Sequence, residues 1–357
     1  MQSPNSRGVP GRGKGESDGQ GKGHGDGPSD PVDEFDAIAG LREQFEAVAR
    51  FLSPGGEVPP LGDTWIGDDA AVVGIRSGGR VLLATDLVVA GVHVDPTLSG
   101  PGDIGYKALM VTVSDLAAMG ARPEYALVSV AGPAGTDLPG LGAGLAEAAG
   151  ETGCAIVGGD LAHSPVLVLS TAVFGDPGPG DASPLLRSGA RPGHQLFVTG
   201  PLGRSAAGLR MLRDPAGGSQ VGTGVHPSGA AADLVRAHRR PVARLAEGEA
   251  ARRSGASAAI DLSDGLVADL VHLAEASNVG VALDRVPVAE GATVEEALGG
   301  GEDYELVVAT GAPDDLLAAF RAAELPPPLP IGRCTDRAGV YTLGGATLPA
   351  GGWRHTF

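Results

Sequence analysis

Five short clusters of glycine and acidic residues carry most of the chemistry that can be inferred from this sequence. They are Gly67-Asp68-Asp69, Thr85-Asp86, Gly158-Gly159-Asp160, Asp261-Leu262-Ser263-Asp264-Gly265 and Gly299-Gly300-Gly301-Glu302-Asp303. Several of them follow apolar runs, where strands are expected to end. Carboxylates gathered at strand ends repel one another unless a cation joins them, and ligands that are all oxygen suit hard cations such as Mg²⁺. The clusters therefore indicate a metal-dependent enzyme of phosphoryl transfer or nucleotide chemistry.

The segment around Asp261 gives the strongest local signal. Asp261 and Ser263 stand two residues apart at the end of an expected strand, so their side chains point the same way. Asp264 then leads into a helix expected over 266–276. Two carboxylates and a hydroxyl at a helix N-terminus suit Mg²⁺ and phosphate. Ser and Asp at this position are also ordinary helix caps, and both interpretations stay open.

The common nucleotide-binding and hydrolase motifs are absent. The two Gly-Lys pairs, at 13–14 and 21–22, are followed by glycine, so neither forms a Walker A motif. No Gly-x-Gly-x-x-Gly fingerprint follows an expected strand, and no His-Glu-x-x-His occurs. A Gly-x-Ser-x-Gly elbow after a strand is also absent, which disfavours an α/β-hydrolase. The clusters thus indicate a nucleotide enzyme without a P-loop.

Length and composition predict two domains and exclude some partners. A chain of 357 residues, 42% of them hydrophobic, can bury sizeable cores. Its net charge of −17 argues against nucleic acid or an anionic membrane surface as a partner. No apolar run reaches transmembrane length, no signal-peptide pattern is present, and the two cysteines match no disulfide or metal spacing. We expect a cytoplasmic protein.

Apolar periodicity predicts an α/β (α+β) organisation in both halves of the chain. We expect a disordered Gly-rich tail over 1–30, a first domain over 31–178 and a second over 185–357, with a boundary rich in Gly, Pro and Asp near 175–191. The expected helices are 31–52, 102–120, 138–150, 205–212, 228–239, 241–253 and 266–276. The expected strands are 70–75, 81–89, 125–130, 155–157, 166–173, 195–199, 258–262 and 280–283, with Gly158-Gly159-Asp160 as a turn.

One lysine stands out because the chain otherwise uses arginine. Lys14 and Lys22 lie in the expected tail, and Lys107 is the third and last lysine of the sequence. A compact ammonium group can be required where a guanidinium does not fit, although chance alone also explains the pattern. On the expected helix Lys107 can pair with Asp103 or Asp115, or reach a phosphate, and we favour a structural pairing.

Taken together, these segments resemble the thiamine-monophosphate kinase family of the aminoimidazole-ribonucleotide-synthetase-like superfamily. The resemblance runs from about residue 35 to the C-terminus, and its specificity comes from the number and order of the motifs. The segments that carry it are Ile66–Ala71, Ala84–His93, Tyr106–Leu109, Ser114–Ala121, Gly158–Asp160, Arg187–Gly193, Ile260–Leu266 and Gly300–Leu306.

The resemblance implies a fold and a set of site residues. It implies two α/β domains per subunit, with N-terminal domains that pair strands across a homodimer and ATP bound near that interface. The implied Mg²⁺ ligands are Asp69, Thr85, Asp86, Asp115, Asp160, Asp261 and Asp264. The implied ATP contacts are Gly159, Asp160, Arg187 and Ser263, and the implied thiamine phosphate contacts are His93, Glu302 and Trp353.

The activity implied by the resemblance is transfer of phosphate from ATP to thiamine phosphate, which gives thiamine diphosphate. The accepting phosphate oxygen is already ionised, so no strong general base is needed. Two alternatives remain. One is a superfamily relative that uses ATP to activate an amide or carbonyl oxygen. The other is a non-catalytic nucleotide-binding protein, which the acidic residues disfavour because buried carboxylates are costly without a cation.

Overall fold

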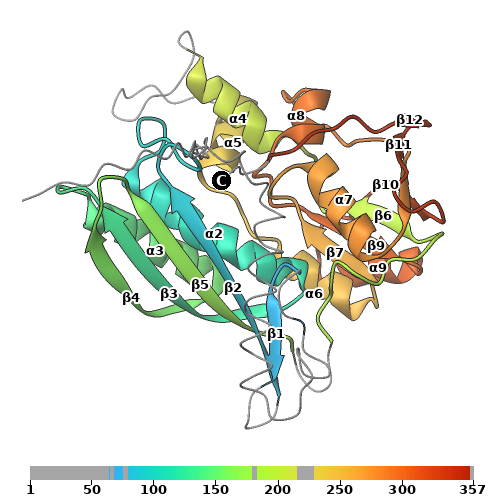
Figure 1. The fold of residues 1–357 in the computed structure, drawn as a ribbon, viewed down its shortest axis with the longest axis horizontal. Helices are drawn as coiled ribbons and strands as arrows, with labels where there is room; N and C mark the ends of the chain where they lie inside the picture. Colours follow the sequence, from blue (N-terminus) through green and yellow to red (C-terminus); the bar gives the residue numbers. More distant parts are fainter. Residues whose placement is uncertain (1–63, 65–67, 75–78, 179–182, 215–228, 354–357) are drawn as a thin grey trace, which may run out of the picture.

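The structure is a computed structural model that describes residues 64, 68–74, 79–178, 183–214 and 229–353. The tail expected over 1–30 and the helix expected over 31–52 lie outside these residues. Two separate sheets, each covered by helices, form two units that lie side by side (Figure 1). This architecture confirms the predicted α/β (α+β) class. None of the helices in the described ranges combines the length and apolar character needed to cross a membrane.

The N-terminal unit is a five-stranded sheet with helices on one face. Its elements are β1 (Ala71–Gly74), β2 (Arg80–Val89), α2 (Pro101–Ala118), β3 (Arg122–Gly132), α3 (Leu138–Thr152), β4 (Ala155–His163) and β5 (Val168–Asp176). The strand order is β1-β2-β5-β3-β4, antiparallel except for the parallel pair of β3 and β4. α2 and α3 pack on one face, and no helix of the described residues covers the other, which we call the open face (Figure 1).

The C-terminal unit is a seven-stranded sheet with helices on both faces. Its strands are β6 (Gln195–Val198), β7 (Ala258–Asp261), β8 (Gly280–Leu283), β9 (Leu306–Thr310), β10 (Leu329–Thr335), β11 (Tyr341–Leu343) and β12 (Ala346–Thr347). Its helices are α4 (Arg204–Arg213), α5 (Ala230–Arg239), α6 (Leu245–Arg253), α7 (Leu266–Ala276), α8 (Val294–Gly299) and α9 (Pro313–Ala322). Alternate residues along the strands face α7 and α8 on one side and α6 and α9 on the other, so both faces are apolar.

Helix α2 is the element that joins the two units. Buried residues surround it on all sides, as expected for a helix that is packed on every face. One side lies on β2 and β5, and another contacts α6 and β7 of the C-terminal unit. Tyr304 of the C-terminal unit belongs to the same core cluster as the buried residues of α2. Any functional residue on α2 is therefore held in place by both units.

The Gly158-Gly159-Asp160 segment differs from the sequence prediction. It forms no turn between two short strands, but lies inside the single strand β4, which continues to His163. Strand pairing explains the difference, because β4 runs parallel to β3 and Ser129 stands opposite Asp160. The hydrogen bonds of this ladder outweigh the turn preference of the two glycines.

Candidate active site

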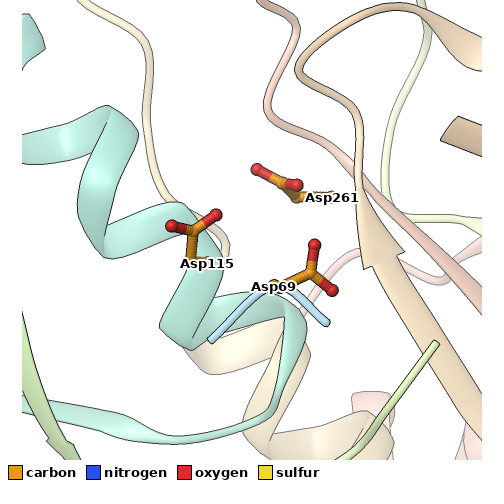
Figure 2. Close-up of side chains that lie close together, drawn as sticks. All are labelled: Asp69, Asp115 and Asp261. Atoms are coloured by element: carbon orange, nitrogen blue, oxygen red, sulfur yellow. The ribbon is translucent and has the colours of Figure 1, made fainter. Parts of the chain in front are cut away.

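Three carboxylates from three distant segments meet between the two units. Asp69 lies just before β1, Asp115 lies on α2 and Asp261 is the last residue of β7. Each offers one oxygen to a group whose atoms all lie within 4.8 Å of one another. Figure 2 shows the three side chains converging on one point. We call these residues the carboxylate cluster.

Among the described residues, the hydrogen bonds of the cluster leave a buried oxygen of Asp69 without a donor. Nη2 and Nε of Arg187 donate to Asp69 Oδ1 at 2.7 and 3.2 Å. Asp69 Oδ2 is buried and has no hydrogen-bond partner in the described structure. Ser114 Oγ donates to Asp261 Oδ2 at 2.6 Å. A buried carboxylate oxygen without a donor is costly, and a cation would satisfy it.

Burial and mutual repulsion change the acidity of the cluster. Burial, with the charge of Asp69, raises the pKa of Asp261 to about 7. Burial and the charges of Asp86, Asp261 and Asp69 raise the pKa of Asp115 well above its usual range. Burial also raises the pKa of Asp69, although Arg187 opposes this shift. The cluster therefore holds protons at mildly acidic pH and favours a cation in their place.

Asp86 and Asp264 extend the cluster toward solvent. Burial and, less strongly, the charge of Asp264 raise the pKa of Asp86 to about 6, against a hydrogen bond from Thr112 that lowers it. Asp264 lies in the loop between β7 and α7. The buried Asp269 carboxyl fixes this loop by accepting hydrogen bonds from the backbone N–H groups of Asp264 and Gly265. The structure thus brings five of the seven predicted metal ligands together.

The other two predicted ligands, Thr85 and Asp160, lie on the open face. Thr85 precedes Asp86 on β2, so its side chain points to the opposite face of the sheet, where its hydroxyl donates to Thr171 O at 2.9 Å. Asp160 lies on the edge strand β4, three strands from β2. Three strand spacings amount to about 14 Å. Within one subunit, Thr85 and Asp160 do not join the carboxylate cluster, and Gly159 is equally remote.

A cavity of about 560 Å³ opens beside Asp86 and Asp264. We call it the central cavity. All three predicted substrate residues, His93, Glu302 and Trp353, line it, and so does Ser263. The three substrate residues come from the turn after β2, the loop before β9 and the last described residues of the chain. The cavity is large enough for a small organic molecule that reaches the acidic residues with one end.

The loop before β9 places Glu302 by an unusual backbone conformation. Glu302 and Tyr304 both have positive φ angles, 66° and 51°, which are uncommon for residues other than glycine. Their backbone N–H groups donate to Ser263 O at 2.7 Å and to Leu262 O at 2.9 Å. Strained backbone that neighbouring contacts hold in place is typical of binding and catalytic sites.

Lys107 has a different partner from the one expected. Its ammonium group lies 2.6 Å from Glu302 Oε1 and donates to His93 O at 3.3 Å. Asp103 pairs instead with Arg240 at 2.9 Å. The favoured pairing with Asp103 or Asp115 is therefore wrong, because helical spacing considers only one helix and Arg240 approaches from the loop after α5. Sequence reasoning also missed His238 and Ser205, although the rarity of lysine pointed to Lys107.

The fold and site together define the class of the protein. Its two halves match two family models, AIR synthase related protein, N-terminal domain, over residues 67–176, and AIR synthase related protein, C-terminal domain, over residues 191–343. These two matches span most of the chain. The protein is thus an AIR synthase related protein, and both matched regions contribute residues to its carboxylate cluster.

Individual relatives show to which family within this class the chain belongs. Thiamine-monophosphate kinase of Salmonella typhimurium is 38% identical over 276 residues, 74% of this chain and 81% of the relative. The thiamine-monophosphate kinase of Mycobacterium tuberculosis is 39% identical over 257 residues, which cover 68% of this chain and 73% of the relative. The solved structure of AaThiL complexed with AMPPCP and TMP is 29% identical, with a TM-score of 0.73 and coverage of 90% of this chain and 97% of that one. The chain belongs to the thiamine-monophosphate kinase family.

Proposed function

We propose that this chain transfers the terminal phosphoryl group of ATP to thiamine phosphate. The observation that carries the proposal is the central cavity, which joins His93, Glu302 and Trp353 to Asp86 and Asp264. A relative of the same fold has been solved with AMPPCP, an analogue of ATP, and with TMP. Thiamine phosphate fits this arrangement, with its rings beside Glu302 and Trp353 and its phosphate toward the acidic residues.

The acidic residues suit Mg²⁺. Asp69, Asp86, Asp115, Asp261 and Asp264 supply only oxygen ligands, and Asp69 Oδ2 is buried without a donor. The raised pKa values of Asp69, Asp86, Asp115 and Asp261 reflect a cost that a bound cation removes. When bound, Mg²⁺ neutralises phosphate charge and lets two polyanions approach each other.

The chain's own residues orient the two substrates. An oxygen of the acceptor phosphate forms a bond to the γ-phosphorus, while the bond from that phosphorus to the β–γ bridging oxygen breaks and ADP leaves with its electron pair. The acceptor oxygen is ionised at neutral pH, so no side chain has to remove a proton. Ser263 lies in the wall of the central cavity, and Arg187 holds Asp69 of the carboxylate cluster in place. Arg187 also offers charge to ATP phosphates.

A homodimer that forms through the open face is part of the proposal. Leu87, Tyr125, Leu127 and Phe174 lie on this face, with exposures between 38% and 55%. Adjacent apolar residues exposed on several strands are typical of a protein interface. Thr85 and Asp160 lie on the same face, so a second copy that covers it would enclose these predicted ligands. Both cysteines are free and buried, which suits a reducing cytoplasm.

A product assay tests the function. The protein is incubated with thiamine phosphate and γ-labelled ATP, with and without Mg²⁺, and we expect labelled thiamine diphosphate only with Mg²⁺. Asp264→Asn should reduce turnover by at least about a hundredfold while the fold persists, because the substitution removes a charge that faces the phosphates. Asp336→Asn, at an exposed position, is the matched control.

The same assay separates the alternatives. ADP release only with a different, amide-containing acceptor would identify a synthetase-type activity. Tight ATP binding without turnover on any acceptor would identify a non-catalytic binding protein. Normal turnover in Asp264→Asn would overturn the metal assignment but leave the kinase activity intact.

A further inference from the structure

A buried lysine forms part of the wall of the central cavity. Lys107 on α2 is only 2% exposed, and lysine is almost never buried this fully without a partner. Its partner is Glu302, at 2.6 Å from Oε1. The Glu302 side chain keeps 26% of its surface exposed, in the cavity that it lines. The pair therefore presents one carboxylate to a ligand while its counter-ion stays behind it.

The second oxygen of Glu302 lies beside His238. His238 Nδ1 lies 3.4 Å from Glu302 Oε2 and 3.0 Å from Ser205 Oγ. Burial and the charge of Lys107 lower the pKa of His238 to about 4, so the imidazole is neutral at pH 7. The charges of Lys107 and Glu302 offset each other, neutral His238 adds none, and Arg213 is a further charged residue in the cavity wall. The positive φ angles of Glu302 and Tyr304 define the backbone conformation from which the Glu302 side chain extends.

Two parts of thiamine phosphate are candidates for Glu302. The thiazolium ring carries a positive charge and would seek a counter-ion. The aminopyrimidine ring is neutral and carries an amino group that donates hydrogen bonds. A charge-balanced pair attracts a cation weakly, because the lysine offsets the carboxylate. A carboxylate oxygen that is fixed in place remains a strong acceptor for an N–H group.

We propose that Lys107 is a positioning residue that presents Glu302 as a charge-balanced hydrogen-bond acceptor for the amino group of the substrate's aminopyrimidine ring. The inference rests on the proposed function. It assigns substrate specificity to the Lys107–Glu302 pair, of which the sequence resemblance supplied only Glu302. Lys107 acts through Glu302 and does not contact the substrate phosphate.

A double-mutant cycle tests the role of Lys107. Thiamine phosphate binding is measured by calorimetry without ATP for wild type, Lys107→Met, Glu302→Gln and the double variant. Each single variant leaves one charge unpaired, so we expect binding at least about tenfold weaker. The double variant is neutral and keeps an acceptor oxygen, so it should bind more tightly than either single variant. A double variant as weak as Lys107→Met or weaker would overturn the proposal, because Lys107 would then contact the substrate itself.

The matched control is an ion pair outside the cavity. Arg122 and Glu249 form an exposed pair at 2.8 Å. Arg122→Met, Glu249→Gln and their combination should leave thiamine phosphate binding unchanged within about twofold. A similar loss in these variants would mean that any lost ion pair weakens binding, and would overturn the specific role of Lys107.

A substrate analogue tests the same inference on the wild-type protein, which needs no variant to fold. Oxythiamine phosphate keeps the thiazolium ring but carries an oxo group in place of the amino group. We expect it to bind at least about tenfold more weakly than thiamine phosphate, and the difference to shrink in the double variant, whose glutamine amide can donate to the oxo group. Equal binding of both compounds to wild type would overturn this inference alone. Failure of wild type to bind thiamine phosphate at all would overturn the proposed function and this inference with it.

Discussion

At the scale of single residues, protons and cations compete for the same carboxylates. The pKa values of Asp69, Asp115 and Asp261 are raised in the folded protein, that of Asp261 from 3.8 to about 7. Such groups make the folded state bind more protons than the unfolded state between pH about 4 and 7. Their contribution to the free energy of unfolding therefore falls as pH rises through this range. A divalent cation that binds in place of the protons restores this contribution to the free energy of unfolding.

The expected outcome is an effect of Mg²⁺ on stability that depends on pH. At pH 8 fewer protons compete for the cluster, and Mg²⁺ at a hundredfold excess over its Kd should add about 2.7 kcal/mol to the free energy of unfolding. At pH 5.5 protons compete with Mg²⁺, so the increase should be smaller. Thermal unfolding with and without Mg²⁺ at both pH values measures the effect. Asp115→Asn should abolish the increase and the exposed Asp336→Asn should keep it, whereas an equal increase at both pH values would contradict the prediction.

Residue types and spacing predicted part of this site. The Asp-x-Ser-Asp segment indicated a possible cation site at Asp261 and Asp264, with helix capping as the alternative, whereas Asp69 was expected as a ligand from the family resemblance, and these metal roles stay predictions. The partner of Lys107 could not be predicted from them, because Glu302 lies on a loop from the other unit and reaches Lys107 only after the two units pack. The positive φ angle of Glu302 could not be predicted from the sequence either. The glycines before it suggest a flexible loop, whereas the structure holds the Glu302 carboxylate in one place.

At the scale of elements, glycines let α2 and α3 approach closely. A Cβ atom on Gly144 of α3 would overlap the backbone of Gly102, and one on Gly105 of α2 would overlap the carbonyl of Leu141. Two helices that meet backbone to backbone leave no room for side chains between them. This close contact sets the position of α2, and therefore of Asp115 and Lys107.

We expect Gly144→Ala to reduce the free energy of unfolding by about 1–3 kcal/mol, because the added methyl group forces the helices apart. Gly142→Ala, two residues away on the same helix, should stabilise the protein by about 0.5–1 kcal/mol, because it meets open space and favours the helix. Urea denaturation of both variants measures the difference. Equal stability of the two variants would show that the α2–α3 contact does not constrain the fold.

Element types were predictable where the apolar pattern was strong. The sequence located α2, α7 and the strands around them to within a few residues. It failed at Gly158–Asp160, because whether β4 continues past its glycines depends on hydrogen bonds with β3, which lies far along the chain. Local glycine content predicts a turn, and the strand ladder overrides it.

At the scale of the whole molecule, the open face is the surface through which we propose that two subunits associate. Leu127 on β3, 41% exposed, lies among the apolar residues of this face. We expect wild type to sediment as a dimer and Leu127→Asp as a monomer, because a charge buried in a dimer interface costs several kcal/mol. Sedimentation velocity measures the mass.

The control for association is an apolar residue exposed elsewhere. Val294 at the start of α8 is 49% exposed, and Val294→Asp should remain dimeric, since an acidic residue is also favourable in the first turn of a helix. A monomeric wild type, or a dimeric Leu127→Asp, would show that the open face is not the interface.

The two units complete each other's polar groups across the boundary between them. Ser114 on α2 donates to Asp261 on β7, 147 residues later in the chain, and Arg187 holds Asp69, 118 residues before it. Neither half of the chain contains the carboxylate cluster, so a fragment or chimaera that separates them lacks it from the start. For anyone who wishes to transplant or recombine this site, the smallest portable piece is the pair of units together with the contact surface that α2 maintains.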